Sequence, residues 1–364
     1  MGNRKCLFLY PFSILYRLIT DIRNMLYDKG ILQSEEFRIP VICVGNITVG
    51  GTGKTPHSEY LIRLLQNEFK VAFLSRGYKR KSKGFRIVTP ESACREAGDE
   101  PLQIARKFPD IIAAVDINRR NGIKTIMKEH PETEVILLDD GFQHRRVKPG
   151  LSIILTDYNR LMTRDHLMPF GRLREAVNNR KRADIIIISK TPEGITEQEM
   201  RELTAEVISH PDQKLFFTKI IYKDLIPVFE NMPSGGIFPS IAGVDKYGMV
   251  LVTGIAIPDS LFSFLGKRFR EIIHLDFPDH HRYSEDDIKK IQKAWESLKS
   301  QEKILITTEK DAVRLREFTN IEDSIKRAFF SLPVNVGFIN DDNHEFDNLI
   351  IDYVRKNNPN NRVP

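Results

Sequence analysis

A glycine-rich segment that ends in Gly53, Lys54 and Thr55 is the part of this sequence best suited to bind phosphate. An apolar run at residues 41–44 precedes it, and Pro56, a residue favoured in the first turn of a helix, follows it. In such a loop the backbone N–H groups surround phosphate oxygens, the lysine adds positive charge and the threonine hydroxyl binds magnesium. The sequence therefore predicts a phosphate-binding loop, or P-loop. The residues predicted to contact a nucleotide are Thr48, Val49, Gly50, Gly51, Thr52, Gly53, Lys54 and Thr55.

The loop departs from the strict pattern G-x-x-x-x-G-K-[ST], because Thr48 stands at the first glycine position. The motif alone therefore leaves a second interpretation, a glycine-rich loop that binds nothing. An apolar strand before the loop, a helix after it and the Lys-Thr pair at its end favour phosphate binding.

Two carboxylates, Asp139 and Asp140, follow a second apolar run at residues 135–138. Ligands of open α/β sheets bind at the carboxyl ends of the strands. A carboxylate at that position commonly completes the magnesium shell beside the P-loop hydroxyl. The alternative is an ordinary Asp-Asp-Gly turn after a strand, and the P-loop in the same sequence makes it the less favoured interpretation.

Two further clusters carry groups that transfer protons. Asp99 and Glu100 precede a helical segment at residues 101–108, and His280 and His281 precede another helix. A carboxylate that accepts the proton of a hydroxyl would serve a kinase. First-turn acids and surface histidines are the simpler interpretations. Spacing alone does not show that Asp99 and His280 meet.

Short β-branched runs alternate with helix-length segments between residues 41 and 190, which predicts a mostly parallel sheet. Proline and glycine interrupt this pattern at residues 222–248, and it resumes from residue 249. We predict an α/β protein with a P-loop NTPase-like sheet and a smaller C-terminal α/β domain. The predicted parts are an N-terminal segment at 1–38, a core domain at 39–221, a linker with short strands at 222–248, and the smaller domain at 249–364.

The composition indicates a folded, intracellular chain with anionic partners. With 364 residues, 41% of them hydrophobic, it can bury a large core, and three scattered cysteines do not make a disulfide framework. The net charge of +6 is uneven: residues 76–86 hold six basic residues and no acid, and residues 145–182 hold ten basic and three acidic residues. Such patches suit phosphate, anionic lipid or nucleic acid, and solvated loops are the alternative interpretation of each.

The N-terminal segment is apolar and aromatic at residues 6–16 and continues as an amphipathic helix. It is too short to span a bilayer and lacks a signal-peptide cleavage pattern. Two interpretations are open, a helix in the membrane interface or a helix packed on the protein's own core. The aromatic residues ahead of the helix favour membrane contact.

Seven segments in order closely resemble the tetraacyldisaccharide 4'-kinase family. They lie at residues 44–56, 74–78, 98–101, 138–145, 173–175, 277–281 and 307–311. The resemblance implies an ATP- and Mg²⁺-dependent enzyme of lipid A synthesis. Such an enzyme phosphorylates the 4'-hydroxyl of tetraacyldisaccharide 1-phosphate at the cytoplasmic face of the bacterial inner membrane, and it has a P-loop core, a linker and a smaller domain.

The resemblance also assigns roles to residues. Lys54 would neutralise phosphate charge, Thr55 and Asp139 would hold Mg²⁺, Asp140 would support that site and Glu175 would join the metal shell. Asp99, tuned or oriented by His280, would be the base for the sugar hydroxyl, once the two domains close over ATP. Arg76, Arg119 and Arg174 are candidates for substrate or phosphate contacts.

Two functions of other classes compete with this prediction. A P-loop ATPase that switches membrane or partner binding would use the loop and the amphipathic helix, but would leave Asp99 and His280 without a role. A nucleic-acid-binding NTPase would use the basic patch, but the sequence has no RNA-binding signature, so we expect no nucleic acid as partner.

Overall fold

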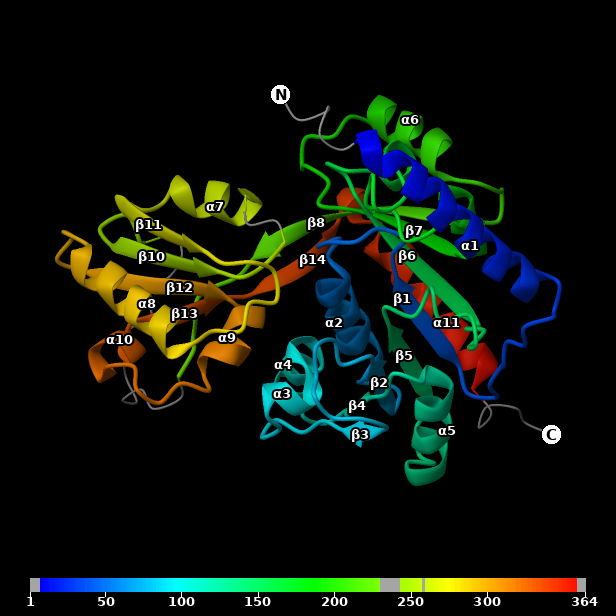
Figure 1. Ribbon diagram of the computed structural model, residues 1–364, viewed down its shortest axis with the longest axis horizontal. Helices are drawn as coiled ribbons and strands as arrows, with labels where there is room; N and C mark the ends of the chain where they lie inside the picture. The colour runs from blue at the N-terminus through cyan, green and yellow to red at the C-terminus, as the bar shows by residue number, and fades with distance from the viewer. Residues whose placement is uncertain (1–6, 230–242, 257–258, 359–364) are drawn as a thin grey trace. The chain divides into compact units, whose positions relative to one another are not determined.

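The computed structural model describes residues 7–229, 243–256 and 259–358 (Figure 1). The chain forms two compact units. Unit 1 comprises residues 1–97, 104–220 and 336–364, and unit 2 comprises residues 98–103 and 221–335.

Unit 1 is built on a nine-stranded sheet with the order β14-β8-β7-β6-β1-β5-β2-β4-β3. Neighbouring strands from β8 to β4 run parallel, and the short edge strand β3 runs antiparallel to β4. The strands are β1 Val41–Gly45, β2 Val71–Ser75, β3 Arg86–Ile87, β4 Ile112–Val115, β5 Val135–Asp139, β6 Leu151–Asp157, β7 Ile185–Ser189, β8 Lys214–Tyr222 and β14 Val334–Phe338.

Both faces of this sheet are buried, which explains why its strands are continuous apolar runs. In β1, Val41 and Cys43 join one core cluster, whereas Ile42 and Val44 join the other. The first cluster includes side chains from α5 (Arg119–Glu129) and α6 (Glu197–Val207). The second includes side chains from α2 (Lys54–Leu65), α4 (Asp99–Lys107) and α11 (Asn343–Asn357).

Strand β1 lies at the point where the strand order reverses. It pairs with β5 on one side and with β6 on the other. The carboxyl ends of these strands flank a crevice in such sheets, and ligands bind there. The P-loop follows β1 and Asp139 ends β5, so the fold delivers both predicted motifs to this edge.

Unit 2 has a five-stranded sheet with the order β11-β10-β12-β13-β9. All neighbours are parallel except β9, which runs antiparallel to β13. The strands are β9 Ile226–Pro227, β10 Gly248–Thr253, β11 Glu271–Asp276, β12 Lys303–Thr308 and β13 Phe329–Leu332. The helices are α7 Asp259–Gly266, α8 Glu285–Ser297, α9 Glu309–Leu315 and α10 Asp323–Arg327.

Local sequence sets the start of α8. The Ser284 hydroxyl accepts from the Asp287 N–H, and the Asp287 carboxylate accepts from the Ser284 N–H. This capping box satisfies two backbone donors that a helix start otherwise leaves unpaired. The start of α8 is therefore determined by residues of the helix itself.

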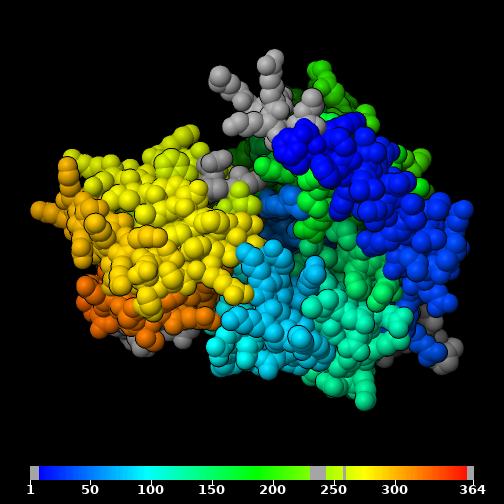
Figure 2. Space-filling model, in the orientation of Figure 1, coloured from blue at the N-terminus to red at the C-terminus, as the bar shows by residue number. Residues whose placement is uncertain are grey.

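The N-terminal helix α1 (Tyr10–Asp28) turns three uncharged polar residues inward and most of its apolar residues outward. Its buried residues are Ser13, Thr20 and Asn24, and Figure 2 shows the helix, in blue, on the surface. The exposed apolar side chains of this segment are Phe8, Tyr10, Phe12, Ile14, Leu15, Leu18, Ile19, Ile22 and Met25. The expected amphipathic helix is present, and its apolar stripe is not covered by the described residues of the protein.

Polar contacts attach α1 to unit 1. The Ser13 hydroxyl donates to the Leu167 carbonyl at 3.0 Å, and the Tyr16 hydroxyl donates to the Arg174 carbonyl at 2.7 Å. Across residues 7–229, 243–256 and 259–358, no helix is both long and apolar enough to cross a membrane.

The two units differ from the predicted domain boundaries in three places. Residues 336–358, predicted in the smaller domain, pack with unit 1, because α11 supplies Phe346, Ile350 and Val354 to the second core cluster. Residues 98–103, predicted in the core domain, pack with unit 2, and residues predicted in the linker also belong to unit 2. Residues 230–242 of the predicted linker lie outside the described residues.

Candidate active site

The P-loop runs from the end of β1 to the start of α2. Gly50 and Gly53 have φ angles of 107° and 83°, a region that side chains other than glycine rarely adopt. Gly53 stands directly before α2, so the loop ends at a helix N-terminus, where free N–H groups and the helix dipole favour an anion. The start of the loop is fixed differently: the Val49 N–H donates to the Arg172 carbonyl at 2.8 Å.

The two carboxylates after β5 have different surroundings. Asp139 is 4% exposed and accepts a hydrogen bond of 3.0 Å from the Ser75 hydroxyl. Asp140 lies 3.6 Å from the Lys54 ammonium and accepts from the Arg174 guanidinium at 2.8 Å. Burial raises the pKa of Asp140, but Lys54 and Arg174 outweigh it and bring this pKa to about 2. Asp140 is therefore ionised and holds both cations beside the P-loop.

The residues present fit a magnesium ion that is shared with nucleotide phosphates. Mg²⁺ prefers oxygen ligands and usually takes only one or two protein ligands besides water and phosphate. The Thr55 hydroxyl and the Asp139 carboxylate supply such oxygens. Across the described residues, no group of three or more His, Cys, Asp and Glu side chains is arranged to hold a metal by itself.

Glu175, predicted as a further metal ligand, lies within a protein network. Its carboxylate is ion-paired with Arg182 at 2.5 Å and accepts from the Gln143 amide at 2.8 Å and from the Asn24 amide at 3.2 Å. Because Asn24 belongs to α1, this buried carboxylate ties the N-terminal helix to the site. Its role as a metal ligand stays a prediction.

The three predicted arginines come from separate elements of unit 1. Arg76 follows β2 and is exposed, Arg119 opens α5 and is 4% exposed, and Arg174 pairs with Asp140. Burial lowers the pKa of Arg119, while the neighbouring Asp139 and Asp140 raise it. The structure thus brings Arg119 and Arg174 to the two carboxylates.

Sequence reasoning assigned no role to His144. Burial, followed by the nearby charges of Arg119, Arg146, Arg23 and Arg76, lowers its pKa to about 4. Four guanidinium groups therefore act on one neutral imidazole, which marks a strongly positive region beside the P-loop edge. The basic residues around position 145 were the available signal, but their convergence with Arg23 and Arg119 depends on the fold.

In unit 2, Asp99 and His280 are in direct contact. Asp99 opens α4 and is 5% exposed, and its carboxylate lies 2.9 Å from Nδ1 of His280. Arg314 of α9 forms an ion pair with the same carboxylate at 2.5 Å. His280 has a φ of 55°. Its backbone N–H donates to the carbonyl of Gly254, the residue that follows β10. Asp99, His280 and Arg314 therefore lie at the carboxyl ends of the unit 2 strands.

Lys310 determines which nitrogen of His280 carries the hydrogen. Its ammonium lies 2.9 Å from Nε2 of His280 and 3.1 Å from the Glu100 carboxylate. Because an ammonium only donates, Nε2 accepts and Nδ1 carries the hydrogen that is donated to Asp99. Burial raises the pKa of Asp99, but the His280 hydrogen bond and the charges of Lys310 and Arg314 hold it well below the usual range. Asp99 is therefore a carboxylate, able to accept a proton.

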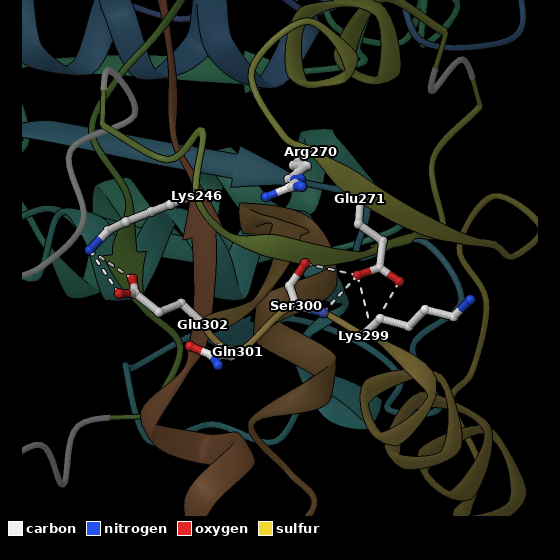
Figure 3. A pocket seen from close by; sticks show the side chains of 7 residues that line it. All are labelled: Lys246, Arg270, Glu271, Lys299, Ser300, Gln301 and Glu302. Carbon is white, nitrogen blue, oxygen red and sulfur yellow. Dashed lines mark hydrogen bonds and ion pairs between the residues drawn. The ribbon is translucent and has the colours of Figure 1, made fainter.

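A polar pocket of about 630 Å³ lies at the opposite, amino-terminal edge of the unit 2 sheet. Figure 3 shows its lining, in which Glu271 accepts from Ser300 and from the Lys299 N–H while Lys246 pairs with Glu302. Its carboxylates are satisfied within the protein, and none of the predicted site residues lines it.

The fold and these sites define a class, the P-loop kinases that bind ATP. The profile of the family described as tetraacyldisaccharide-1-P 4'-kinase matches residues 6–355. This chain belongs to that family.

Named relatives agree with the family match. The tetraacyldisaccharide 4'-kinase of Phocaeicola vulgatus is 47% identical over 355 residues, covering 97% of this chain and 96% of the relative. The tetraacyldisaccharide 4'-kinase of Porphyromonas gingivalis is 40% identical, and the match covers 95% of this chain and 97% of the relative. A crystal structure of LpxK from Aquifex aeolicus in complex with ATP matches with a TM-score of 0.70 at 30% identity, covering 95% of this chain and 98% of that one. The predicted family, fold class, ATP and Mg²⁺ dependence and kinase activity are thereby confirmed.

Proposed function

We propose that this protein transfers the γ-phosphate of ATP to the 4'-hydroxyl of tetraacyldisaccharide 1-phosphate and forms the 1,4'-bisphosphate of lipid A synthesis. The observation that carries the proposal is the family match over residues 6–355, which includes both the P-loop and the Asp99–His280 pair. In the reaction, a bond forms between the sugar oxygen and the γ-phosphorus. The bond from that phosphorus to the β,γ-bridging oxygen breaks, and ADP leaves.

The P-loop edge holds the transferred group. The Lys54 ammonium and the N–H groups before α2 neutralise charge on the phosphates. Thr55 and Asp139 would hold Mg²⁺, which supplies further positive charge to the phosphate oxygens. Asp140 keeps Lys54 and Arg174 beside the loop, as its contacts with both cations indicate. Arg119 and Arg76 are the proposed contacts to the anionic substrate.

Asp99 takes the proton of the 4'-hydroxyl. Phosphoryl transfer has a loose transition state in which the hydroxyl becomes acidic only as its oxygen bonds to phosphorus. A carboxylate that is held ionised can accept the proton at that stage, although its ion pair with Arg314 makes it a weak base beforehand. His280 orients the carboxylate through the hydrogen bond from Nδ1. These roles require the acceptor hydroxyl to reach the Asp99 carboxylate.

The lipid substrate gives α1 a function. Nine side chains of its outer stripe and the preceding turn are apolar and exposed, so water-facing hydrophobic area is available for the acyl region of a bilayer. Its polar face binds Glu175 and the Arg174 carbonyl at the site edge. We infer that α1 lies in the interface of the inner membrane on the cytoplasmic side and brings the site to the sugar headgroup.

Product mass tests this proposal. The protein is incubated with MgATP and tetraacyldisaccharide 1-phosphate in detergent micelles, and the lipid is analysed by mass spectrometry. We expect a gain of one phosphate on this lipid and none on its 4'-deoxy analogue. A phosphate gained equally by the 4'-deoxy analogue, or no phosphorylated lipid at all, would refute the assigned acceptor.

A further inference from the structure

Three successive carbonyl groups of the P-loop accept hydrogen bonds from side chains that have no assigned role. The Gly51 carbonyl accepts from the Lys190 ammonium at 2.6 Å. The Thr52 carbonyl accepts from the Ser189 hydroxyl at 2.8 Å, and the Gly53 carbonyl lies 2.7 Å from Nδ1 of His57. All of these residues belong to unit 1.

Two of the donors come from the carboxyl end of β7. Ser189 is its last residue and is fully buried, and Lys190 follows with a φ of 58°. The Lys190 ammonium is also paired at 2.7 Å with Asp157, the last residue of β6. Because its charge is already matched by a buried carboxylate, Lys190 serves the loop backbone rather than the nucleotide charge.

The third donor, His57, lies one turn into α2. A carbonyl oxygen only accepts, so Nδ1 of His57 carries the hydrogen and Nε2 accepts from the Thr218 hydroxyl at 3.0 Å. Burial lowers the pKa of His57 to about 4, which keeps the ring neutral near pH 7. The ring thus connects the P-loop to β8, which carries Thr218.

The planarity of the peptide bond explains what these contacts do. The carbonyl of one residue and the N–H of the next point in opposite directions within one plane. Anchoring the Thr52 carbonyl therefore fixes the direction of the Gly53 N–H, and anchoring the Gly53 carbonyl fixes that of the Lys54 N–H. These are the donors at the start of α2, where an anion binds.

We propose that Ser189, His57 and Lys190 are positioning residues that hold the P-loop backbone in its phosphate-binding conformation before the nucleotide arrives. The proposal rests on nucleotide binding by this loop in the function given above. Preorganised N–H donors bind phosphate more tightly, because the loop loses no conformational entropy when the nucleotide binds.

The test compares Ser189→Ala and His57→Leu with Ser58→Ala in the full-length protein. Ser58 is a matched control because it is 1% exposed, lies on the same helix and has a hydroxyl for which the described residues provide no partner. Affinities for ATP and ADP are measured by calorimetry, together with KM and kcat for both substrates. We expect each test variant to bind ATP about tenfold more weakly, the effect of one lost hydrogen bond, with the KM for lipid unchanged.

A conservative substitution separates positioning from packing. In His57→Asn the side-chain amide nitrogen takes the place of Nδ1, so this variant should recover most of the ATP affinity that His57→Leu loses. ATP affinity in Ser189→Ala and His57→Leu equal to that of Ser58→Ala would overturn the proposal. Ser189→Ala decides the matter if His57→Leu does not fold. Failure of the unsubstituted protein to bind ATP would instead refute the proposed function.

Discussion

Asp99 is surrounded by groups that keep its carboxylate ionised and oriented. His280, Lys310 and Arg314 all act on its carboxylate, and none of these residues belongs to the P-loop. The carboxylate and the nucleotide site are therefore separable by substitution.

Replacing Asp99 should affect turnover and leave ATP binding intact. We expect Asp99→Ala to lower kcat by about 10²- to 10⁴-fold, the usual contribution of a general base, with little change in ATP affinity. Lys54→Ala should reduce both kcat and ATP affinity, because Lys54 is the proposed partner of the phosphates. Calorimetry and steady-state kinetics measure the two effects, with Asp110→Ala at an exposed acid as control. Equal losses of ATP affinity in the Asp99 and Lys54 variants would contradict this division of roles.

Lys310 should act through the tautomer of His280. Lys310→Met removes the donor that keeps the hydrogen on Nδ1, so the ring no longer has to donate to Asp99. We expect kcat to fall about tenfold, the effect of one charged hydrogen bond, while ATP affinity holds and Lys310→Arg recovers part of the loss. The exposed Lys289→Met is the control. Unchanged kcat over the whole pH range in Lys310→Met would show that Lys310 does not set the tautomer.

At the scale of elements, periodicity predicted the parts of the fold that are determined locally. The alternating runs between residues 41 and 190 correspond to β1, β2, β4, β5, β6 and β7, and the pattern that resumes at residue 249 corresponds to β10, β11 and β12. Each run is short, β-branched and bounded by turn residues, so its conformation follows from nearby residues.

The elements that sequence reasoning missed depend on distant pairing. Strand β14 returns to the first sheet from far along the chain and α11 covers that sheet, but neither is distinguished locally from the elements of unit 2. The same holds for the site: Asp99 and His280 are 181 residues apart, and only the fold shows that they touch. The outward apolar face of α1 was likewise one of two interpretations until burial was known.

The apolar stripe of α1 should be needed for membrane binding and not for stability. Leu15, Leu18 and Ile19 are 56%, 55% and 59% exposed. Replacing all three with serine removes apolar area that would be buried in the membrane. Full burial of one such side chain contributes about 1.5–3 kcal/mol. Binding to vesicles that contain anionic lipid should therefore fall more than about tenfold. The thermal midpoint should not change. Vesicle co-sedimentation and a thermal melt measure these effects.

The opposite face of α1 provides the control for that experiment. Ser13→Ala and Asn24→Ala remove polar contacts to unit 1 but leave the apolar stripe intact. They should affect stability more than vesicle binding. Vesicle binding by the triple serine variant at the level of the unsubstituted protein would contradict membrane contact through this face.

At the scale of the whole molecule, the chain passes from unit 1 into unit 2 near residue 220 and returns near residue 336. Both termini of the described chain thus belong to unit 1, which contains the P-loop, α1 and α11. A substitution that weakens the unit 1 core is therefore expected to affect nucleotide binding and membrane contact together.

Two histidines, the buried His57 and the half-buried His144, make unit 1 sensitive to mild acid. The pKa of His57 falls from its usual 6.5 to about 4 in the folded protein, chiefly because of burial, and that of His144 does likewise. The unfolded chain therefore binds more protons between these values, so stability is fully present above about pH 6.5 and is lost as the pH falls toward 4. For the buried His57 we expect a loss of roughly 1–2 kcal/mol between pH 7 and pH 5, and a smaller loss for the half-buried His144, because solvent screens its charge.

Denaturant unfolding at several pH values measures this effect. His57→Asn removes one of the titrating groups, so its unfolding free energy should change less between pH 7 and pH 5 than that of the unsubstituted protein. His130→Asn, at a surface histidine, serves as control. Equal pH dependence of the His57→Asn variant and the unsubstituted protein would show that burial of His57 does not govern acid sensitivity.

The fate of the γ-phosphate tests the central claim most directly. ATP labelled on that phosphate is supplied with tetraacyldisaccharide 1-phosphate in micelles, and the label is partitioned between lipid and water for the unsubstituted protein and for Asp99→Ala. The account predicts label in the lipid for the former and almost none for the latter. Label released as free phosphate, with none in the lipid, would contradict it and indicate a P-loop ATPase that switches partner or membrane binding.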